Sequence, residues 1–291
     1  MYANALASWR GHPFVRRFSR TLGEVMAYVI LAVGAIVMVL PFVWMISTSL
    51  KEAGEVFSYP PRLIPSHLAF HNYVDAWRAA PFGRYFFNSL FVATSVTLGQ
   101  LISCSLAAYA FARMNFPGKA LLFTAFLSTL MIPRQITLIP SFLVLRELHW
   151  LDTYYALIVP FIASAFGTFM LRQTFMSIPR ELEDAAKLDG CSRLGFLWRV
   201  MLPLSRPTLA SLALFTFMGN WNSYLWPLIM TNSQKMRTLQ IGLRFLVCQE
   251  GGTNWGMLMA ATVVVSIPIL IFYLFVQKQF VESLTFTGIG G

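Results

Sequence analysis

Few side chains that do chemistry in enzymes occur in this 291-residue chain, and they do not gather. There are four histidines, which lie far apart: His12, His67, His71 and His149. The sequence has no His-Glu-x-x-His pair, no cluster of histidine and cysteine ligands, and no glycine-rich phosphate loop ending in Lys-Ser or Lys-Thr. Three widely spaced cysteines make no disulfide framework. We therefore expect this chain not to be an enzyme, and to hold no metal or cofactor of its own.

Acidic residues gather instead in one segment, 177–190. Its start is typical of a helix, because Pro179 suits the first turn and the carboxylates after it offset the positive end of the helix dipole. These carboxylates are Glu181, Glu183 and Asp184. Glu183 and Lys187 have the spacing and order of a stabilising i,i+4 ion pair. The sequence therefore predicts a short charged helix.

A second short helix is expected directly after the first. Gly190 is a helix stop, and Ser192 is placed to cap a helix that ends at Pro203. Two short helices that meet at a glycine form a compact elbow, on which Ala185 and Ala186 offer a surface that a partner can cover closely. The alternative is a solvated connector between two membrane segments, and spacing alone does not decide between them.

The segments before and after this elbow are strongly apolar. The chain is 57% hydrophobic and only 12% charged, about half the charge of a soluble domain. Six runs carry no charged residue: 25–50, 85–112, 120–133, 153–171, 207–234 and 253–277. A spanning helix needs about 20 mostly apolar residues. The third run reaches that length only if it continues past Arg134 towards Leu145. We therefore expect an all-α integral membrane protein with six transmembrane helices.

The placement of basic residues indicates the topology. A basic cluster precedes the first apolar run, and basic residues flank the short loop 113–119, so both termini are expected in the cytoplasm. The first run is too long for the core of a signal peptide, and we expect it to be retained. The formal net charge of +10 does not indicate nucleic-acid binding, because the charges do not gather on a soluble module.

The expected organisation has three parts. Residues 1–24 form a cytoplasmic segment, 25–279 the six-helix domain and 280–291 a cytoplasmic tail. The elbow lies in the long inside loop at about 173–206.

The third span is interrupted by Pro133, Arg134 and Pro140. Pro133 removes a backbone donor and predicts a kink or break. We expect Arg134 to face protein or water, because a guanidinium in lipid is costly. It then lines a cavity or binds a partner across the pore. The alternative is that the helix ends early and Arg134 reaches the outer surface.

The fifth span carries amides and aromatic rings that suit a path for sugars. On a continuous helix of 3.6 residues per turn, Asn220 and Tyr224 share one face, and Asn222 and Trp226 share another. We expect one pair to border the translocation path; packing of both pairs is the alternative.

The second span has small residues at four-residue spacing, Gly99, Ser103 and Ala107, which favours close packing against a neighbouring helix. Gln100 beside them is not expected to face lipid.

The elbow resembles the EAA loop of ABC importer permeases. That family pattern is roughly Glu-Ala-Ala, three residues, Gly, and after a longer gap an apolar-Leu-Pro element. Here it reads Glu183-Asp184-Ala185-Ala186-Lys187-Leu188-Asp189-Gly190, then Met201-Leu202-Pro203. Asp184 stands where the family usually has glutamate. Other stretches are similar to carbohydrate importer permeases of the smaller maltose-permease type: Phe42-Val-Trp-Met-Ile-Ser-Thr-Ser-Leu-Lys51, Asn88-Ser-Leu, Ala107-Ala-Tyr-Ala-Phe-Ala-Arg113, Trp221-Asn222 and Phe286-Thr-Gly-Ile-Gly-Gly291.

The resemblance implies a type I ABC importer permease fold in a bacterial plasma (inner) membrane. It implies that the chain forms a heterodimeric pore with a second permease subunit, surrounded by membrane lipid. Two copies of an ATPase subunit then hold ATP and Mg, and an extracytoplasmic solute-binding protein delivers the cargo. The ATPase-coupling residues that it implies are Glu183, Asp184, Ala185, Ala186, Asp189 and Gly190. In that family the tail also approaches the ATPases, but the usual lysine near the end is missing here.

The expected cargo is a sugar or a polyol-type molecule, and disaccharides, oligosaccharides, sugar alcohols, glucosides and glycerol phosphate all remain open. Two other classes compete with the importer. An ion-coupled secondary transporter or channel usually has ionisable residues inside its spans, whereas the apolar segments here contain only Arg134. An intramembrane enzyme needs a nucleophile, base or metal cluster at membrane depth, and the sequence offers none.

Overall fold

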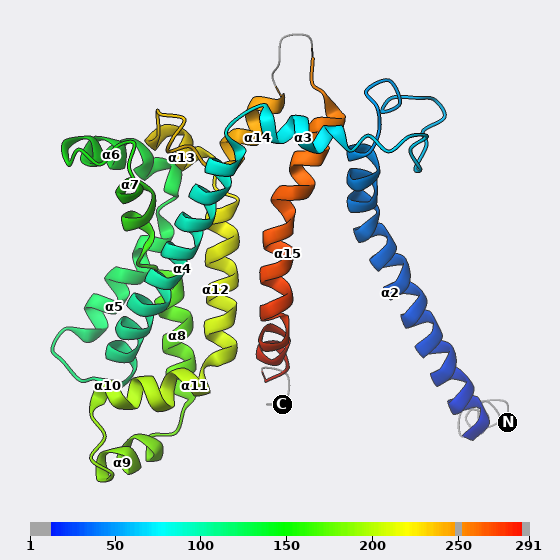
Figure 1. The fold of residues 1–291 in the computed structure, drawn as a ribbon. Helices are drawn as coiled ribbons and strands as arrows, with labels where there is room; N and C mark the ends of the chain where they lie inside the picture. The colour runs from blue at the N-terminus through cyan, green and yellow to red at the C-terminus, as the bar shows by residue number, and fades with distance from the viewer. Residues whose placement is uncertain (1–12, 248–251, 287–291) are drawn as a thin grey trace.

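The computed structural model describes residues 13–247 and 252–286, and every regular element in these ranges is helical (Figure 1). The longest helices are α2 (Pro13–Ser49), α4 (Phe82–Arg113) and α15 (Trp255–Phe286). Residues 1–12 and 287–291, at the ends of the predicted N-terminal segment and tail, lie outside the described residues. No side chain is described for 13–22 or 279–286.

Four helical segments of the described chain are long and apolar enough to cross a membrane: Gly23–Ser49, Phe82–Arg113, Tyr154–Ser177 and Trp255–Lys278. The third of these joins α7 (Tyr154–Ile158), η2 (Val159–Phe161) and α8 (Ala165–Ser177). Two further pairs of helices are sharply bent, and counting each pair as one span brings the number to six. The all-α membrane architecture is therefore confirmed.

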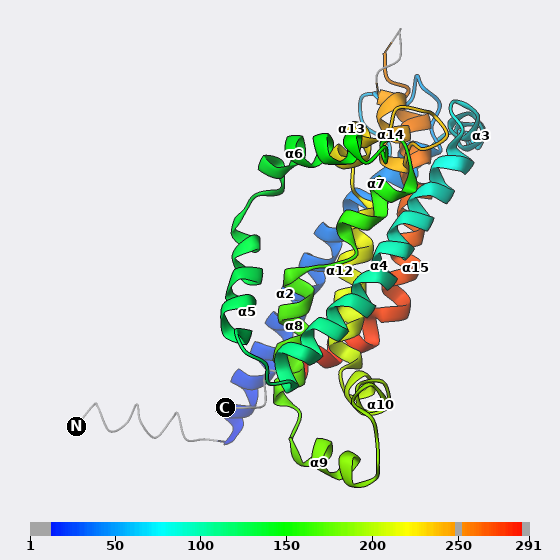
Figure 2. The ribbon, with the colours of Figure 1, turned by 90° about the vertical axis from the view of Figure 1, so that its left-hand side faces the viewer.

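The first bent pair corrects the prediction for the third span. Helix α5 (Lys119–Ser128) and η1 (Thr129–Met131) end before Pro133, and α6 (Arg134–Glu147) departs at 102° to them. Figure 2 shows α5 along the bundle and α6 across the end opposite the elbow, which is named the outer end after the predicted topology. The helix does not continue straight towards Leu145, because a residue before proline disfavours the α conformation: Ile132 has φ −89° and ψ 115°.

The prediction of one continuous helix for the fifth span is corrected at both ends of α12. Helix α12 (Arg206–Trp221) meets the preceding inner segment at 82°. It ends at Trp221, and a separate helix α13 (Leu225–Met230) follows. The backbone angles of the linking residues Asn222 (φ −86°, ψ 3°) and Tyr224 (φ −115°, ψ −55°) depart from those of a regular α-helix. Residues 215–226 are therefore not one continuous helix.

Helices α4, α8, α12 and α15 build the packed core. The indole Nε1 of Trp221, which is fully buried, donates to Val265 O at 3.1 Å and so ties α12 to α15. The rings of Phe217 and Phe272 stack with centroids 4.5 Å apart. Helix α2 meets α15 at the outer end of the bundle, and the two helices diverge towards the inner end, as Figure 1 shows.

Two of the three small residues of α4, Gly99 and Ser103, pack closely against the segment 159–164, as their spacing predicts. A Cβ on Gly99 would lie 2.9 Å from Cγ2 of Ile162, and the Ser103 hydroxyl donates to Ile162 O. Gln100 is buried and does not face lipid, which confirms that prediction.

At the outer end, α3 (His71–Arg78) and α14 (Leu239–Val247) lie across the bundle (Figure 1). At the inner end, the elbow protrudes from between α8 and α12. It consists of α9 (Glu181–Leu188), α10 (Arg193–Phe196), the π-helix η3 (Leu197–Met201) and α11 (Leu202–Leu204).

Candidate functional site

The elbow is closed by a Schellman motif. Gly190 has φ +74° and donates its N–H to Lys187 O at 3.0 Å, while the N–H of Cys191 reaches back to Ala186 O at 2.8 Å. These two bonds satisfy carbonyls that the end of α9 leaves without a partner, and they require the left-handed conformation at Gly190. The helix stop predicted at Gly190 is therefore confirmed.

The ion pair predicted between Glu183 and Lys187 is also present, with the carboxylate and ammonium 3.2 Å apart. Lys187 Nζ lies 3.2 Å from Asp184 as well, and its hydrogen bonds to Asp184 and Glu183 raise the pKa of the ammonium. Asp184 is exposed, whereas the Glu183 side chain is only 17% exposed. Glu183 thus faces the bundle and Asp184 faces outwards.

Arg113 holds the elbow to the bundle, and no role for it was predicted from the sequence. Its side chain is 4% exposed, and a guanidinium nitrogen lies 3.7 Å from Glu183. It donates to Phe175 O at 2.8 Å and also to Ile178 O, so it joins the ends of α4 and α8 to α9. The available signal was its position, a single charge that ends a long apolar span.

The second half of the elbow is anchored in the core. The Ser192 hydroxyl accepts the N–H of Gly195 at 3.1 Å, so the predicted cap is confirmed. Phe196, Leu197 and Met201 are buried. Together with Leu171 and Phe175 of α8, they belong to one apolar cluster.

One face of α9 is left uncovered. Leu188 is 90% exposed, and Ala185 and Asp189 are exposed beside it. Ala186 packs inwards against the apolar cluster, so the two alanines do not form one shared surface. The elbow therefore presents an apolar patch of Leu182, Ala185 and Leu188, rimmed by carboxylates.

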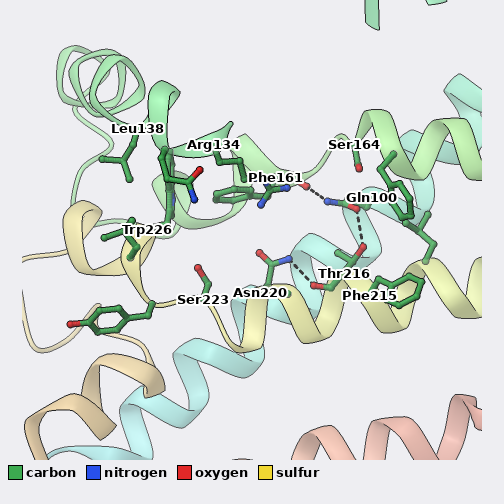
Figure 3. Close-up of a pocket in the computed structure, with 16 residues that line it drawn as sticks. Gln100, Arg134, Leu138, Phe161, Ser164, Phe215, Thr216, Asn220, Ser223 and Trp226 are labelled. Carbon is green, nitrogen blue, oxygen red and sulfur yellow. Dashed lines mark hydrogen bonds between the residues drawn. The ribbon is translucent and has the colours of Figure 1, made fainter. Parts of the chain in front are cut away.

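A second region, a cavity of about 500 Å³, lies towards the outer half of the bundle. It is lined from α4, α6, α8, α12 and the segments 159–164 and 222–226. Figure 3 shows its polar and aromatic side chains converging from these elements. The structure brings three sequence-predicted residues to its wall: Arg134, Asn220 and Tyr224.

A chain of hydrogen bonds fixes one side of the cavity (Figure 3). The Thr216 hydroxyl donates to Gln100 Oε1 at 2.8 Å, and Gln100 Nε2 donates to Phe161 O at 2.7 Å. Asn220 Nδ2 donates to Thr216 O at 2.8 Å. The first two bonds satisfy the buried amide of Gln100 and join α4, α12 and the 159–164 segment into one wall.

The position of Trp226 corrects the prediction of which residues share a face. Trp226 lines the cavity together with Asn220 and Tyr224, whereas Asn222 lies apart and accepts from Gln240 at 3.4 Å. The predicted grouping of Trp226 with Asn222 is wrong, because α12 ends at Trp221 and helical periodicity does not extend to position 226. The Trp226 ring meets that of Phe161 edge-on, with centroids 5.0 Å apart.

Arg134 is the first residue of α6, directly after the break at Pro133. Its guanidinium carbon lies 5.6 Å from the centre of the Phe161 ring, and the side chain is exposed within the single subunit. The helix does end early, as the alternative interpretation required. The bend nevertheless turns Arg134 to the cavity wall.

Comparisons with known proteins agree with this architecture. The chain is 36% identical to the sn-glycerol-3-phosphate transport system permease protein UgpE of Yersinia enterocolitica over 269 residues, which cover 90% of this chain and 95% of that protein. It is 34% identical to the arabinooligosaccharides transport system permease protein AraQ of Bacillus subtilis, covering 86% of this chain and 90% of that protein.

A solved bacterial ABC transporter, described as involved in the import of the acidic polysaccharide alginate, contains a similar chain. The match has a TM-score of 0.80 and 27% identity, and covers 91% of this chain and 98% of that one. The type I importer permease fold expected from the resemblance is thereby confirmed. The model of the binding-protein-dependent transport system inner membrane component matches residues 99–285. This chain therefore belongs to that family of ABC importer permeases.

Proposed function

We propose that the chain forms one half of the pore of an ATP-driven importer, together with a second permease subunit, for a sugar or polyol-type cargo. An extracytoplasmic binding protein delivers the cargo in this proposal. The observation that carries it is the elbow, an anchored structure with an uncovered apolar patch. In this proposal, the exposed apolar patch on the protruding helix is the site to which a protein partner binds.

The partner of the elbow is an ATPase subunit, present in two copies per complex, on which ATP and Mg are bound. Arg113 and the Schellman motif keep the elbow rigid with respect to the bundle. A movement of the ATPase is therefore transmitted to α8 and α12 rather than absorbed in a loop. The coupling residues are those on or beside α9: Glu183, Asp184, Ala185, Ala186, Asp189 and Gly190.

The cavity supports a carbohydrate-type cargo. Aromatic rings, here Phe161 and Trp226, stack on the apolar faces of sugars, and the amide of Asn220 and the hydroxyl of Tyr224 offer bonds to sugar hydroxyls. A volume of about 500 Å³ lies in the range of small-molecule sites. The similar proteins are named for both a charged cargo, glycerol 3-phosphate, and a neutral one, arabinooligosaccharides.

The elbow also supports the orientation in the bacterial plasma membrane. It lies at the same end of the bundle as the N-terminal end of α2 and the C-terminal end of α15 (Figure 1). Docking to a cytoplasmic ATPase therefore puts both termini inside, which agrees with the basic cluster before α2. In this arrangement 1–24 and 280–291 are cytoplasmic, and 25–279 is the membrane domain.

Coexpression with the other subunits tests this proposal. Leu188→Glu places a charge in the apolar patch, and Leu68→Glu, at an exposed leucine of the outer end, is the matched control. We expect the wild type and the control to copurify with the ATPase and to support ATP-dependent uptake in proteoliposomes. Leu188→Glu should lose both. Equal copurification and uptake in all three proteins would show that the elbow is a solvated connector.

A further inference from the structure

The charge of the cavity is one-sided. Its sixteen lining residues include one charged side chain, Arg134, and no aspartate, glutamate, lysine or histidine. The remaining polar groups are neutral amides and hydroxyls from Gln100, Gln135, Asn220 and their neighbours. The cavity wall that the described residues supply is therefore positive, with no carboxylate among them to balance it.

The guanidinium of Arg134 is available to a ligand. Among the described residues its side chain makes no ion pair and no hydrogen bond, and its contact is with the face of the Phe161 ring. The guanidinium carries five N–H donors in a planar fork. This geometry matches the two oxygens of a carboxylate or phosphate.

The backbone adds positive potential at the same place. Pro133 precedes α6 without a side-chain cap, and the N–H groups of Arg134 and Gln135 find no acceptor among the described residues. The first N–H groups of a 14-residue helix carry the positive end of its dipole. The bend at Pro133 thus brings a helix N-terminus and a guanidinium to one wall of the cavity.

We propose that the cavity takes an anionic cargo, a carbohydrate or polyol that carries a phosphate or carboxylate group, and that Arg134 binds this group. Phe161 and Trp226 then contact the carbon skeleton, while Asn220, Ser223 and Tyr224 bond its hydroxyls. This inference rests on the proposed importer function and specifies the chemical class of its cargo. The alternative partner of the Arg134 guanidinium is a carboxylate of the second permease subunit, and the experiment separates this ion pair from binding of the cargo.

The test uses the complete importer in proteoliposomes and three substitutions. Arg134→Gln removes the charge, and Arg134→Lys keeps the charge without the fork. Arg146→Gln removes an exposed arginine from the far end of the same helix, away from the cavity. Binding-protein-dependent uptake and ATPase stimulation are measured with glycerol 3-phosphate, a hexose phosphate and digalacturonate as anionic probes. Maltose and glycerol are the neutral probes.

We expect the wild type to import at least one anionic probe and none of the neutral ones. Arg134→Gln should lower that uptake about tenfold or more, as expected for the loss of a hydrogen bond to a charged group. Arg134→Lys should keep part of the uptake, and Arg146→Gln should equal the wild type. The probe that is imported distinguishes a phosphate from a carboxylate cargo.

Three results would overturn the inference. Import of a neutral probe alone by the wild type would refute it while leaving the importer function intact. Unchanged anionic uptake in Arg134→Gln would show that Arg134 does not bind the cargo. Failure of Arg134→Gln to copurify with the second permease subunit, with assembly restored in Arg134→Lys, would assign Arg134 to an ion pair across the pore. The proposed function itself fails only if no ATPase copurifies with the wild type.

Discussion

Replacement of Gly190 tests whether the shape of the elbow is needed for coupling. Gly190 has φ +74°, and a Cβ built there meets no atom within 4 Å. The cost of a side chain is therefore conformational and not steric, about 1–2 kcal/mol for alanine in the left-handed region. That strain shifts the equilibrium away from the ordered elbow by about 5–30-fold.

The expected effect on coupling follows a graded order. Gly190→Asn should be mild, because asparagine visits the left-handed region most readily after glycine. Gly190→Ala should lower uptake further, and Gly190→Val most, because a β-branched residue tolerates positive φ poorly. All three proteins should insert and copurify with the second permease subunit, since Gly190 contributes no packing. Uptake per permease in proteoliposomes is the measurement.

Gly118 provides a matched control. It also has φ +74° and open space around its Cβ position, but it lies in the turn between α4 and α5. Gly118→Ala carries the same strain outside the elbow and should keep uptake near the wild-type rate. The reasoning is refuted if Gly190→Val transports normally, or if Gly118→Ala loses as much activity as Gly190→Ala.

Three further predictions concern the anchor of the elbow, access to the cavity and a contact between two loops. Arg113→Gln leaves Glu183 without its buried partner and should cost about 2–4 kcal/mol, seen as a lower melting temperature and faster proteolysis within the elbow. Cysteines at Asn220 should change their labelling rate between ATP-free and ATP-bound states, whereas cysteines at the buried Phe217 should stay protected; uniform protection would remove the pathway assignment. Asp152 accepts the N–H groups of Asn232 and Ser233 at 3.0 Å. Burial raises the pKa of Asp152, but hydrogen bonding by the side chain and backbone of Ser233 and the backbone of Asn232, together with the charge of Arg237, outweighs burial and lowers it. Its stabilisation is fully present above the ordinary pKa of 3.8 and is lost as pH falls from there through the lowered pKa, so Asp152→Ala should lower the melting temperature at pH 7, and this difference should shrink as the pH falls below 3.8.

The short-range features of the elbow are predictable from the sequence because each depends on groups within a few residues. The pair Glu183–Lys187 is one helical turn apart, and the Ser192 hydroxyl caps an N–H three residues on. The left-handed glycine at 190 ends the helix that precedes it. None of these contacts depends on where the rest of the chain lies.

The set of residues that line the cavity cannot be predicted in this way. The direction of α6 depends on ψ at two residues around Pro133, and proline predicts a break but not its angle. Because α12 ends at Trp221, Trp226 lies on the same cavity wall as Asn220, whereas the periodicity of a continuous helix predicts different faces for them. Small backbone changes at such breaks rotate every side chain that follows.

The apolar spans, the break at Pro133 and the elbow with its glycine are predictable from the sequence, because run length, proline and local spacing act within one segment. The binding of Arg113 to Glu183 and the end of α8, and the meeting of Arg134, Phe161 and Asn220 at one cavity, are visible only in the folded bundle, because these contacts join residues from separate helices. Their proximity follows from packing across the bundle, which no pattern along one helix contains.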